Sequence, residues 1–302
     1  MTRAGIPART LGRTGLEVTT LGFGAMELRG PRHWKSPRPL SEDEAGEILN
    51  LVLDSGINFI DTSIEYGMSE TVIGKFLRPR RDEYFLATKC GCPLDAPPAP
   101  VQGYANTHVF TREHIVAGVE QSLRRLQTDH LDLLQLHMNP PLSQIHGDNV
   151  IATLHDLQAD GKVRFIGSSS VLPDIEDLVP LGAFDAFQVP YSALEREHEQ
   201  VISAAARTGA GIIIRGGVAR GGAGSGGAIW ARFKQANLEE LAEGAPPAEF
   251  LLRYVISHPG ISTTIVGTAD PAHLKANVVA ATKGPLEADI YAEANRRLDA
   301  LR

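Results

Sequence analysis

The segment Asn58–Gly67, NFIDTSIEYG, decides the fold, because an apolar run typical of a buried strand ends there in polar side chains. The same arrangement recurs in FLATKC at Phe85–Cys90 and in LLQLHMNP at Leu133–Pro140. In a (β/α)8 barrel the carboxyl ends of all strands meet at one face, where active sites of that fold are built. We therefore expect one cluster at this face, formed by Asp61, Tyr66, Lys89 and His137.

Apolar runs and amphipathic stretches alternate along the chain, which is the pattern of β-α-β units on a parallel sheet. Signals for helix starts lie between the runs: the capping box of Ser41 and Glu44, Thr111, and Asp270 before Pro271. The length of 302 residues suits a barrel of about 250 residues with additions, so we predict a single domain over residues 1–302. The predicted strands are Thr19–Gly24, Asn58–Thr62, Tyr84–Thr88, Leu131–Leu136, Val163–Ile166, Ala186–Val189, Gly211–Ile214 and Thr264–Val266.

Segments outside this repeat complete the predicted α/β fold, a (β/α)8 TIM barrel with an N-terminal β-hairpin and a C-terminal helix. Arg9–Val18 predicts the hairpin, which we expect to close the bottom of the barrel, and Leu286–Arg302 predicts the helix. Two connections are longer than usual, the proline-rich Gly91–Phe110 and the glycine-rich Gly216–Ala245. We expect both to be loops at the active face, where long loops carry specificity.

Composition excludes several classes of function. The chain has 43% hydrophobic and 22% charged residues, a net charge of −7 and a pI near 5.8, so it lacks the basic surface that nucleic acid or an anionic membrane attracts. No stretch approaches the roughly 18 apolar residues of a membrane span, and Met1–Thr10 has no signal-peptide core. We expect a soluble, cytoplasmic protein; its oligomeric state is not indicated.

The only two cysteines, Cys90 and Cys92, lie two positions apart, where a disulfide would be strained. Zinc sites usually need four ligands at a recognisable spacing, and no others accompany this pair in the sequence. We therefore expect two partly buried thiols and no metal site.

The chemistry of the four predicted neighbours fits together. A tyrosine phenol with a pKa of about 10 is a weak acid for protonating a carbonyl oxygen at neutral pH. A neighbouring lysine ammonium favours the phenolate and lowers that pKa, an aspartate keeps the lysine charged, and a histidine can orient the carbonyl oxygen. Taken singly, an Asp or Tyr that follows a strand is most often a helix cap or a packing residue, and a single His137 on an apolar strand is more often a buried core histidine. Together, the four residues predict a proton donor.

Longer motifs run through nearly the whole chain. They include LGRTGLEVTTLGFGAMEL at Leu11–Leu28, SGINFIDTSIEYGMSETVIGKFL, LRRLQTDHLDLLQLH, GKVRFIGSSS, FQVPYSALER and IVGTADPAHLKAN at Ile265–Asn277. In this order the chain resembles the aldo-keto reductase family, NAD(P)H-dependent enzymes on a (β/α)8 barrel. The resemblance implies that Tyr66 is the general acid, that Lys89 and Asp61 tune it, and that His137 orients the carbonyl.

The resemblance also implies a cofactor site. GSSS at Gly167–Ser170 matches the family pattern GVSN, so Ser169 and Gln188 are expected to hold the nicotinamide carboxamide, while Arg215 takes the place of a stacking aromatic residue. His273 stands where relatives that prefer NADPH often carry an arginine for the 2′-phosphate. We expect NADPH, with NADH not excluded, and contacts from Gly24, Ala25, Met26, Asp61, Ser168, Ser169, Ser170, Gln188, Arg215, Gly216, Val218, Arg220, Gly267, Thr268, His273 and Asn277.

The expected partner is a small-molecule carbonyl substrate, and the loops predicted at the barrel mouth supply candidate contacts for it in Trp34, Met138 and Trp230. Two other functions stay open. The family also resembles the β-subunits of certain potassium channels, which implies a noncatalytic nucleotide-binding regulatory subunit. An unrelated barrel lyase or hydrolase is the second alternative.

Overall fold

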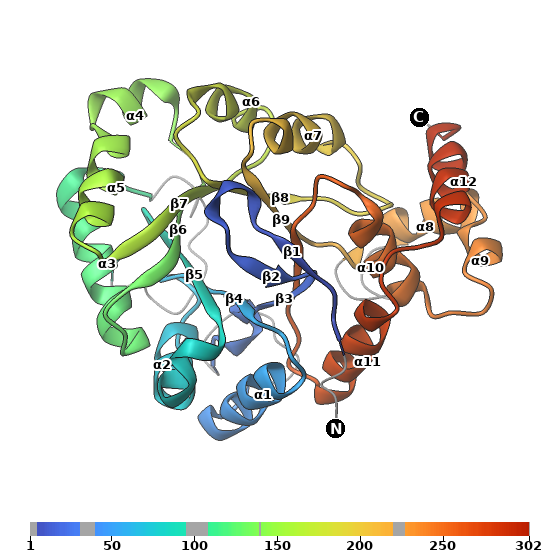
Figure 1. Cartoon of the computed structure of the whole chain (residues 1–302), viewed down its shortest axis with the longest axis horizontal. Coiled ribbons are helices and arrows are strands. Elements are labelled where there is room, and N and C mark those ends of the chain that lie inside the picture. Colours follow the sequence, from blue (N-terminus) through green and yellow to red (C-terminus); the bar gives the residue numbers. More distant parts are fainter. Residues whose placement is uncertain (1–4, 31–39, 95–107, 139, 220–226, 302) are drawn as a thin grey trace.

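A computed structural model describes residues 5–30, 40–94, 108–138, 140–219 and 227–301. Eight parallel strands close into a barrel in the order β10-β3-β4-β5-β6-β7-β8-β9, as the sequence predicts (Figure 1). Their bounds are β3 Leu21–Gly24, β4 Phe59–Asp61, β5 Phe85–Cys90, β6 Leu131–His137, β7 Val163–Ser169, β8 Ala186–Pro190, β9 Gly211–Arg215 and β10 Thr263–Val266.

The strands differ from the prediction at their ends. The predicted first strand Thr19–Gly24 is broken at Thr20, whose amide donates to the carbonyl of Pro7 at 2.8 Å. At the other end, β6 and β7 run further than predicted, because His137 pairs with Ser169 in the parallel register. This extension places three of the predicted site residues, His137, Ser168 and Ser169, on strands rather than on loops.

Helices surround the barrel (Figure 1). The predicted helix starts are confirmed: Ser41 and Glu44 form a reciprocal capping box, Thr111 accepts from the amide of His114, and Asp270 accepts from that of Ala272. The α-helices are α1 Glu42–Asp54, α2 Ser69–Leu77, α3 Arg112–Leu126, α4 Leu142–Gly147, α5 Val150–Ala159, α6 Ile175–Leu178, α7 Glu199–Arg207, α8 Gly227–Gln235, α9 Leu238–Leu241, α10 Pro247–Ser257, α11 Pro271–Thr282 and α12 Ala288–Asp299.

An antiparallel hairpin, β1 (Ala8–Thr10) and β2 (Glu17–Thr19), crosses the amino-terminal end of the barrel (Figure 1). Its side chains Leu11, Leu16 and Val18 are buried in one cluster with inward residues of the barrel strands, among them Phe59 and Leu133. The predicted closure of the bottom by this hairpin is therefore confirmed, and the opposite, carboxyl-terminal face carries the site.

The connection Gly216–Ala245 was expected to be a loop, but this expectation is wrong for its second half, which contains α8 and α9. Trp230 and Phe233 are spaced for one helix face and pack with their ring centroids 5.9 Å apart, which anchors α8 to the core. Among the described helices, none has the length and the apolar run that crossing a bilayer requires.

Candidate active site

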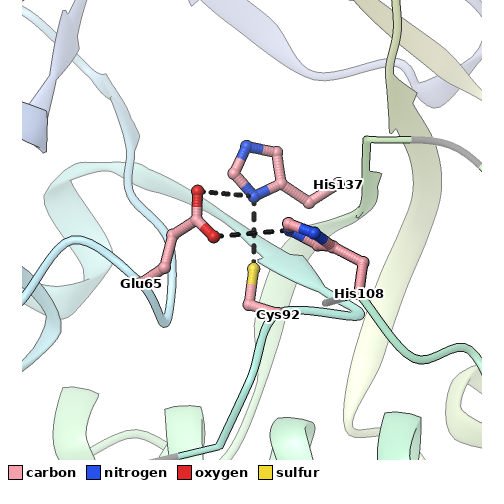
Figure 2. Close-up of side chains that lie close together, drawn as sticks. All are labelled: Glu65, Cys92, His108 and His137. Carbon is pink, nitrogen blue, oxygen red and sulfur yellow. Dashed lines mark hydrogen bonds and ion pairs between the residues drawn. The ribbon is translucent and has the colours of Figure 1, made fainter. Parts of the chain in front are cut away.

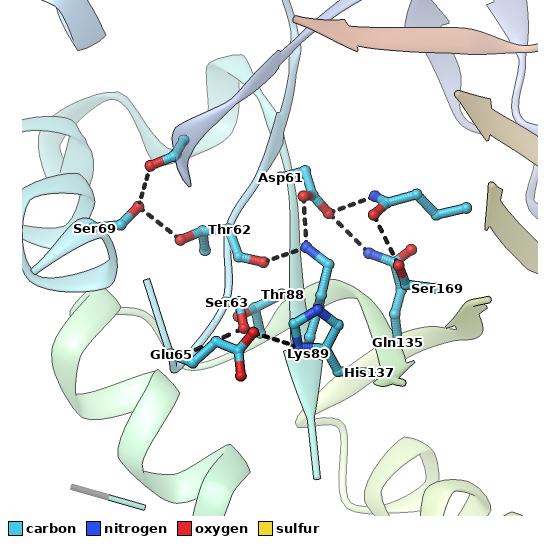
Figure 3. Close-up of polar contacts among 12 residues, drawn as sticks. Asp61, Thr62, Ser63, Glu65, Ser69, Thr88, Lys89, Gln135, His137 and Ser169 are labelled. Atoms are coloured by element: carbon cyan, nitrogen blue, oxygen red, sulfur yellow. Dashed lines mark hydrogen bonds and ion pairs between the residues drawn. The ribbon is translucent and has the colours of Figure 1, made fainter. Parts of the chain in front are cut away.

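A buried ion pair lies at the centre of the carboxyl-terminal face (Figure 3). Lys89 Nζ, from β5, donates to Asp61 Oδ2 at 2.6 Å and to the carbonyl of Thr62 at 2.8 Å, and the Lys89 and Asp61 side chains are 0% and 2% exposed. The other carboxylate oxygen, Asp61 Oδ1, accepts from Gln135 Nε2 at 2.9 Å and from Gln188 Nε2 at 2.8 Å. Three further strands therefore fix the aspartate that closes β4.

The charge state of Lys89 follows from this pairing. Burial on its own would lower the pKa of the ammonium group, because it removes the charge from water. The neighbouring Asp61 carboxylate and Tyr66 phenol outweigh burial, and the pKa of Lys89 is raised. Lys89 is a fixed positive charge at neutral pH.

Tyr66 lies in the connection after β4, where its amide donates to the carbonyl of Ser63 at 3.0 Å. Lys89 Nζ lies 4.9 Å from the centre of its ring, and the ring of His137 stands edge-on to it with the centroids 6.2 Å apart. The structure therefore brings the four predicted side chains together.

The proton on Tyr66 is governed by two opposing effects. Burial raises the pKa of Tyr66, and the Lys89 charge lowers it; the net direction is upward. The predicted effect of lysine is thus present but smaller than that of burial. The phenol stays protonated at neutral pH, which is the form that a general acid requires.

His137 closes β6, with its Nδ1 3.2 Å from Cys92 Sγ and 3.2 Å from Glu65 Oε1. Burial lowers the pKa of His137 to about 3, and the Glu65 carboxylate offsets this only in part. The imidazole is therefore neutral at physiological pH, with one ring nitrogen carrying a proton and the other a lone pair.

Polar side chains of β7 and β8 lie beside this group. Ser169 Oγ donates to Gln188 Oε1 at 3.1 Å, and the two residues are paired in the sheet register. Ser170 follows β7, with its amide bonded to the Gln188 carbonyl at 2.9 Å and its hydroxyl 2.6 Å from that of Ser168. These residues, predicted to contact a cofactor, form one buried polar row next to Asp61.

The first and last barrel strands approach closely at the same face. A Cβ atom on Gly267 would lie 2.6 Å from the carbonyl oxygen of Gly24, so only glycine fits there. Ala25, which follows Gly24, is buried, whereas the side chain of Met26 is 42% exposed. Glycine at this point allows the first and last strands to lie this close together.

The remaining predicted cofactor residues line β9 and the start of α11. Arg215 ends β9, half-buried, Gly216 turns the chain with φ +74°, and Val218 is 8% exposed. Thr268 Oγ1 accepts from the amide of Asp270 at 3.0 Å.

His273 and Asn277 both lie on α11. The side chain of His273 is 72% exposed, and its Nε2 lies 3.9 Å from Asp270 Oδ2. Asn277, one turn further, is half-buried. His273 is therefore open to an approaching ligand, but a carboxylate accompanies it.

Of the candidate substrate residues that the structure describes, only Met138 lies next to the site. Met138 directly follows β6, 46% exposed and with φ +54°. Trp230 was expected in a loop; it lies instead in α8, 7% exposed, because its indole packs into the core. Trp34, like the cofactor candidate Arg220, lies outside the described residues.

Sequence reasoning missed Gln135, which holds Asp61, and a group of Glu65, Cys92 and His108 behind His137. A signal for Gln135 was present: it stands two positions before His137 in an otherwise apolar strand, so both face the same side. Cys90 and Cys92, expected to be partly buried, are both fully buried. No comparable pattern in the sequence marks His108.

A model of the aldo/keto reductase family matches residues 20–298. The chain belongs to the aldo/keto reductase family. Members of this family are oxidoreductases that typically bind a nicotinamide nucleotide and act on small carbonyl compounds.

Individual aldo/keto reductases resemble the chain over most of its length. L-galactose dehydrogenase of Arabidopsis thaliana is 31% identical, covering 92% of this chain and 89% of the plant protein. The holo form of aldo-keto reductase AKR11C1 from Bacillus halodurans matches with a TM-score of 0.84 at 29% identity, covering 97% of this chain and 96% of that one. Its apo form matches with a TM-score of 0.77 at 28% identity.

Proposed function

We propose that this aldo/keto reductase reduces an aldehyde or a ketone to an alcohol with a hydride from NAD(P)H, and that Tyr66 is its general acid. The observation that carries the proposal is the buried Lys89–Asp61 pair, whose ammonium lies 4.9 Å from the ring of the protonated Tyr66. A buried charge is costly unless it is paired, so its position beside a phenol is consistent with a functional role.

The described residues fit a nicotinamide. Ser169 and Gln188 offer a hydroxyl and an amide at one point, and Gln135 Oε1 is buried there without a hydrogen-bond partner among the described residues. A carboxamide brings both N–H donors and a carbonyl acceptor, which suits this row. Gly24 and Gly267, where the first and last barrel strands meet at this face, are proposed backbone contacts of the cofactor.

The protein residues divide the work on the substrate oxygen. When bound, the reduced nicotinamide supplies the hydride. Tyr66 holds the proton at its phenol oxygen and donates it to the carbonyl oxygen, while Lys89 stabilises the phenolate that remains. Asp61 keeps Lys89 charged and positioned, and the Nε2 side of His137 is available to hydrogen-bond and orient the same carbonyl oxygen.

NADPH is the proposed cofactor, with NADH as the alternative, because His273 occupies the position from which relatives read the 2′-phosphate. An imidazole is a weaker phosphate partner than a bidentate guanidinium. The preference is therefore expected to be modest. Met138, exposed beside His137, is a proposed substrate contact.

The second candidate is a noncatalytic nucleotide-binding regulatory subunit. The complete set of acid, ammonium, carboxylate and imidazole favours the enzyme, since nucleotide binding alone needs neither a proton donor at Tyr66 nor a carbonyl-orienting imidazole at His137. One set of measurements separates the two: absorbance loss at the NADPH band with a panel of aldehydes, ketones and sugars, the reverse reaction with L-galactose, and NADPH binding followed by fluorescence.

Tyr66→Phe is the decisive variant, because it removes the proton donor and almost no volume. We expect turnover to fall about 10²–10⁴-fold while NADPH binding persists. Tyr84→Phe, a change to a buried tyrosine outside the site, is the matched control. Near-normal turnover of Tyr66→Phe with saturating cofactor would contradict the assignment, and cofactor binding without turnover of any compound would favour the regulatory subunit.

A further inference from the structure

Four potential metal ligands, one of them His137 of the candidate active site, lie close together (Figure 2). They are Glu65, Cys92, His108 and His137, and their ligand atoms all lie within 4.8 Å of one another. Glu65 follows β4, Cys92 and His108 stand at the two ends of the connection between β5 and α3, and His137 ends β6. Two consecutive strand-to-helix connections and the end of the next strand thus converge on one point.

The spacing of these atoms is close to that of a tetrahedral metal site. His137 Nδ1 lies 3.2 Å from both Cys92 Sγ and Glu65 Oε1, and Glu65 Oε2 lies 3.3 Å from His108 Nε2. Tetrahedral zinc with bonds of about 2.0–2.3 Å places its ligand atoms roughly 3.3–3.6 Å apart. These three separations lie within a few tenths of an ångström of that range, whereas wider pairs of the set, at up to 4.8 Å, must close by about 1 Å for one cation to contact all four donors.

Neighbouring residues hold the donors in place. Gly91, with φ +88°, turns the chain so that Cys92 points back toward β6. The carbonyl of Gly91 accepts from the amide of Val109 at 2.8 Å. This bond ties the segment of His108 to that of Cys92. His114 Nε2 lies 2.8 Å from the carbonyl of Cys92, and Ser63 Oγ lies 3.4 Å from its sulfur. Such outer contacts are what orients the ligands in known metal sites.

Burial and charge point in the same direction. The side chains of Glu65, His108 and His137 are 13%, 3% and 10% exposed, and Cys92 is fully buried. A carboxylate this deep is normally paired with a cation. A divalent ion would balance the charges of one carboxylate and one thiolate, with two neutral imidazoles completing the set.

We propose that Glu65, Cys92, His108 and His137 form a Zn²⁺ site. Mixed sulfur, imidazole and carboxylate donors in tetrahedral array are the ligands that zinc takes in proteins, whereas magnesium and calcium take oxygen. This inference goes beyond the proposed reduction, because Glu65, Cys92 and His108 have no role in that reaction, only His137 is shared, and metal occupancy is measured without cofactor or substrate. Coordination replaces the proton of the Cys92 thiol, which leaves to solvent or buffer.

The site has a consequence for His137. A cation on Nδ1 uses the lone pair of that nitrogen, so the ring proton must sit on Nε2. Nε2 lies on the side of the ring that faces away from the other three ligands (Figure 2). The proposed ion thus holds His137 in the tautomer that donates from Nε2.

The sequence expectation of no metal site rested on ligand spacing around Cys90 and Cys92. The proposed site departs from that expectation: Cys92 and His137 are 45 positions apart in the sequence, and no short motif reveals such a ligand set. Only one of the two thiols takes part; Cys90, at the end of β5, lies outside the ligand set.

Metal binding to the full-length, chelator-treated protein tests the proposal. After Zn²⁺ is added and the excess is removed by dialysis, we expect elemental analysis to find a single Zn²⁺ per chain. When Co²⁺ is added instead, we expect a thiolate charge-transfer band together with the visible bands of a tetrahedral ion. Cys92→Ser and His108→Ala should each weaken Zn²⁺ binding by about 100-fold or more, and Cys90→Ser, a matched buried thiol, should leave it unchanged.

The outcomes are separable from those for the reductase. Absence of stoichiometric Zn²⁺, or binding that Cys92→Ser and His108→Ala leave intact, overturns the site even if the protein reduces carbonyls. If Cys92→Ser fails to fold by circular dichroism, Glu65→Gln together with the Co²⁺ spectrum decides: loss of the tetrahedral bands supports the site, and retention of them contradicts it.

Discussion

The charge of Lys89 is the feature of the proposed active site whose effect can be worked out from the structure. Replacing Lys89 by Met keeps an unbranched, apolar side chain as far as Cε and removes the charged Nζ. The ammonium lies 4.9 Å from the ring of Tyr66, which becomes negative as its proton leaves. At an effective dielectric constant of ~20, unit charges ~5 Å apart interact by ~3 kcal/mol. Losing this stabilisation should lower kcat/KM by ~10²-fold.

The pH dependence should move in a defined direction. Lys89 lowers the pKa of Tyr66 against the larger effect of burial, so its removal raises that pKa further. The alkaline limb of the kcat/KM profile should therefore shift upward in any activity that Lys89→Met retains. Steady-state rates with NADPH and a good aldehyde across the alkaline range measure both effects.

Stability must be separated from catalysis, since Lys89→Met leaves the buried Asp61 without its ammonium. Breaking a buried pair in this way costs ~3–5 kcal/mol, and Gln135 and Gln188 still donate to the carboxylate and reduce the loss. The double variant Lys89→Met with Asp61→Asn removes both charges and should recover stability but not activity. A folded, cofactor-binding Lys89→Met protein with kcat/KM within a few-fold of the parent would refute the reasoning.

Two further predictions concern histidines. Dissociation constants for NADPH and NADH should show a modest NADPH preference that increases in His273→Arg, because a guanidinium binds a phosphate through two hydrogen bonds; constants that are the same in His273→Ala would remove this residue from the site. Burial lowers the pKa of His258, so its ring is neutral in the folded protein and accepts from the amide of Gly260 at 3.1 Å. The free energy of unfolding should therefore decrease as the pH falls below the ordinary histidine pKa of about 6.5, by up to ~1.4 kcal/mol per pH unit. Urea titrations at several pH values measure this free energy, and it should depend less on pH in His258→Asn.

The barrel and its four central side chains were predictable because each depends on local sequence. A strand of a parallel sheet is apolar on both faces, so the polar residue that ends it stands out, as Asp61 and His137 do. Helix starts also depend on residues that are close in sequence, as in the capping box between Ser41 and Glu44.

Other features depend on contacts that sequence spacing hides. Gln135 looks like one polar residue in an apolar run, and only the barrel register places it on Asp61. The glycines before α8 suggested a loop, whereas the packing of Trp230 on Phe233 decides for a helix. His108 and Glu65 come together only because the connections after β4 and β5 lie over the same end of the barrel.

Closure of the barrel between its first and last strands has a consequence for synthesis. Leu21 of β3 pairs with Thr264 of β10, so almost the entire chain must leave the ribosome before the ring of hydrogen bonds is complete. Until then β3 has an unpaired edge, and contacts this distant in sequence form slowly. Chains released before β10 is made should expose that edge, and they are the species most in need of a chaperone.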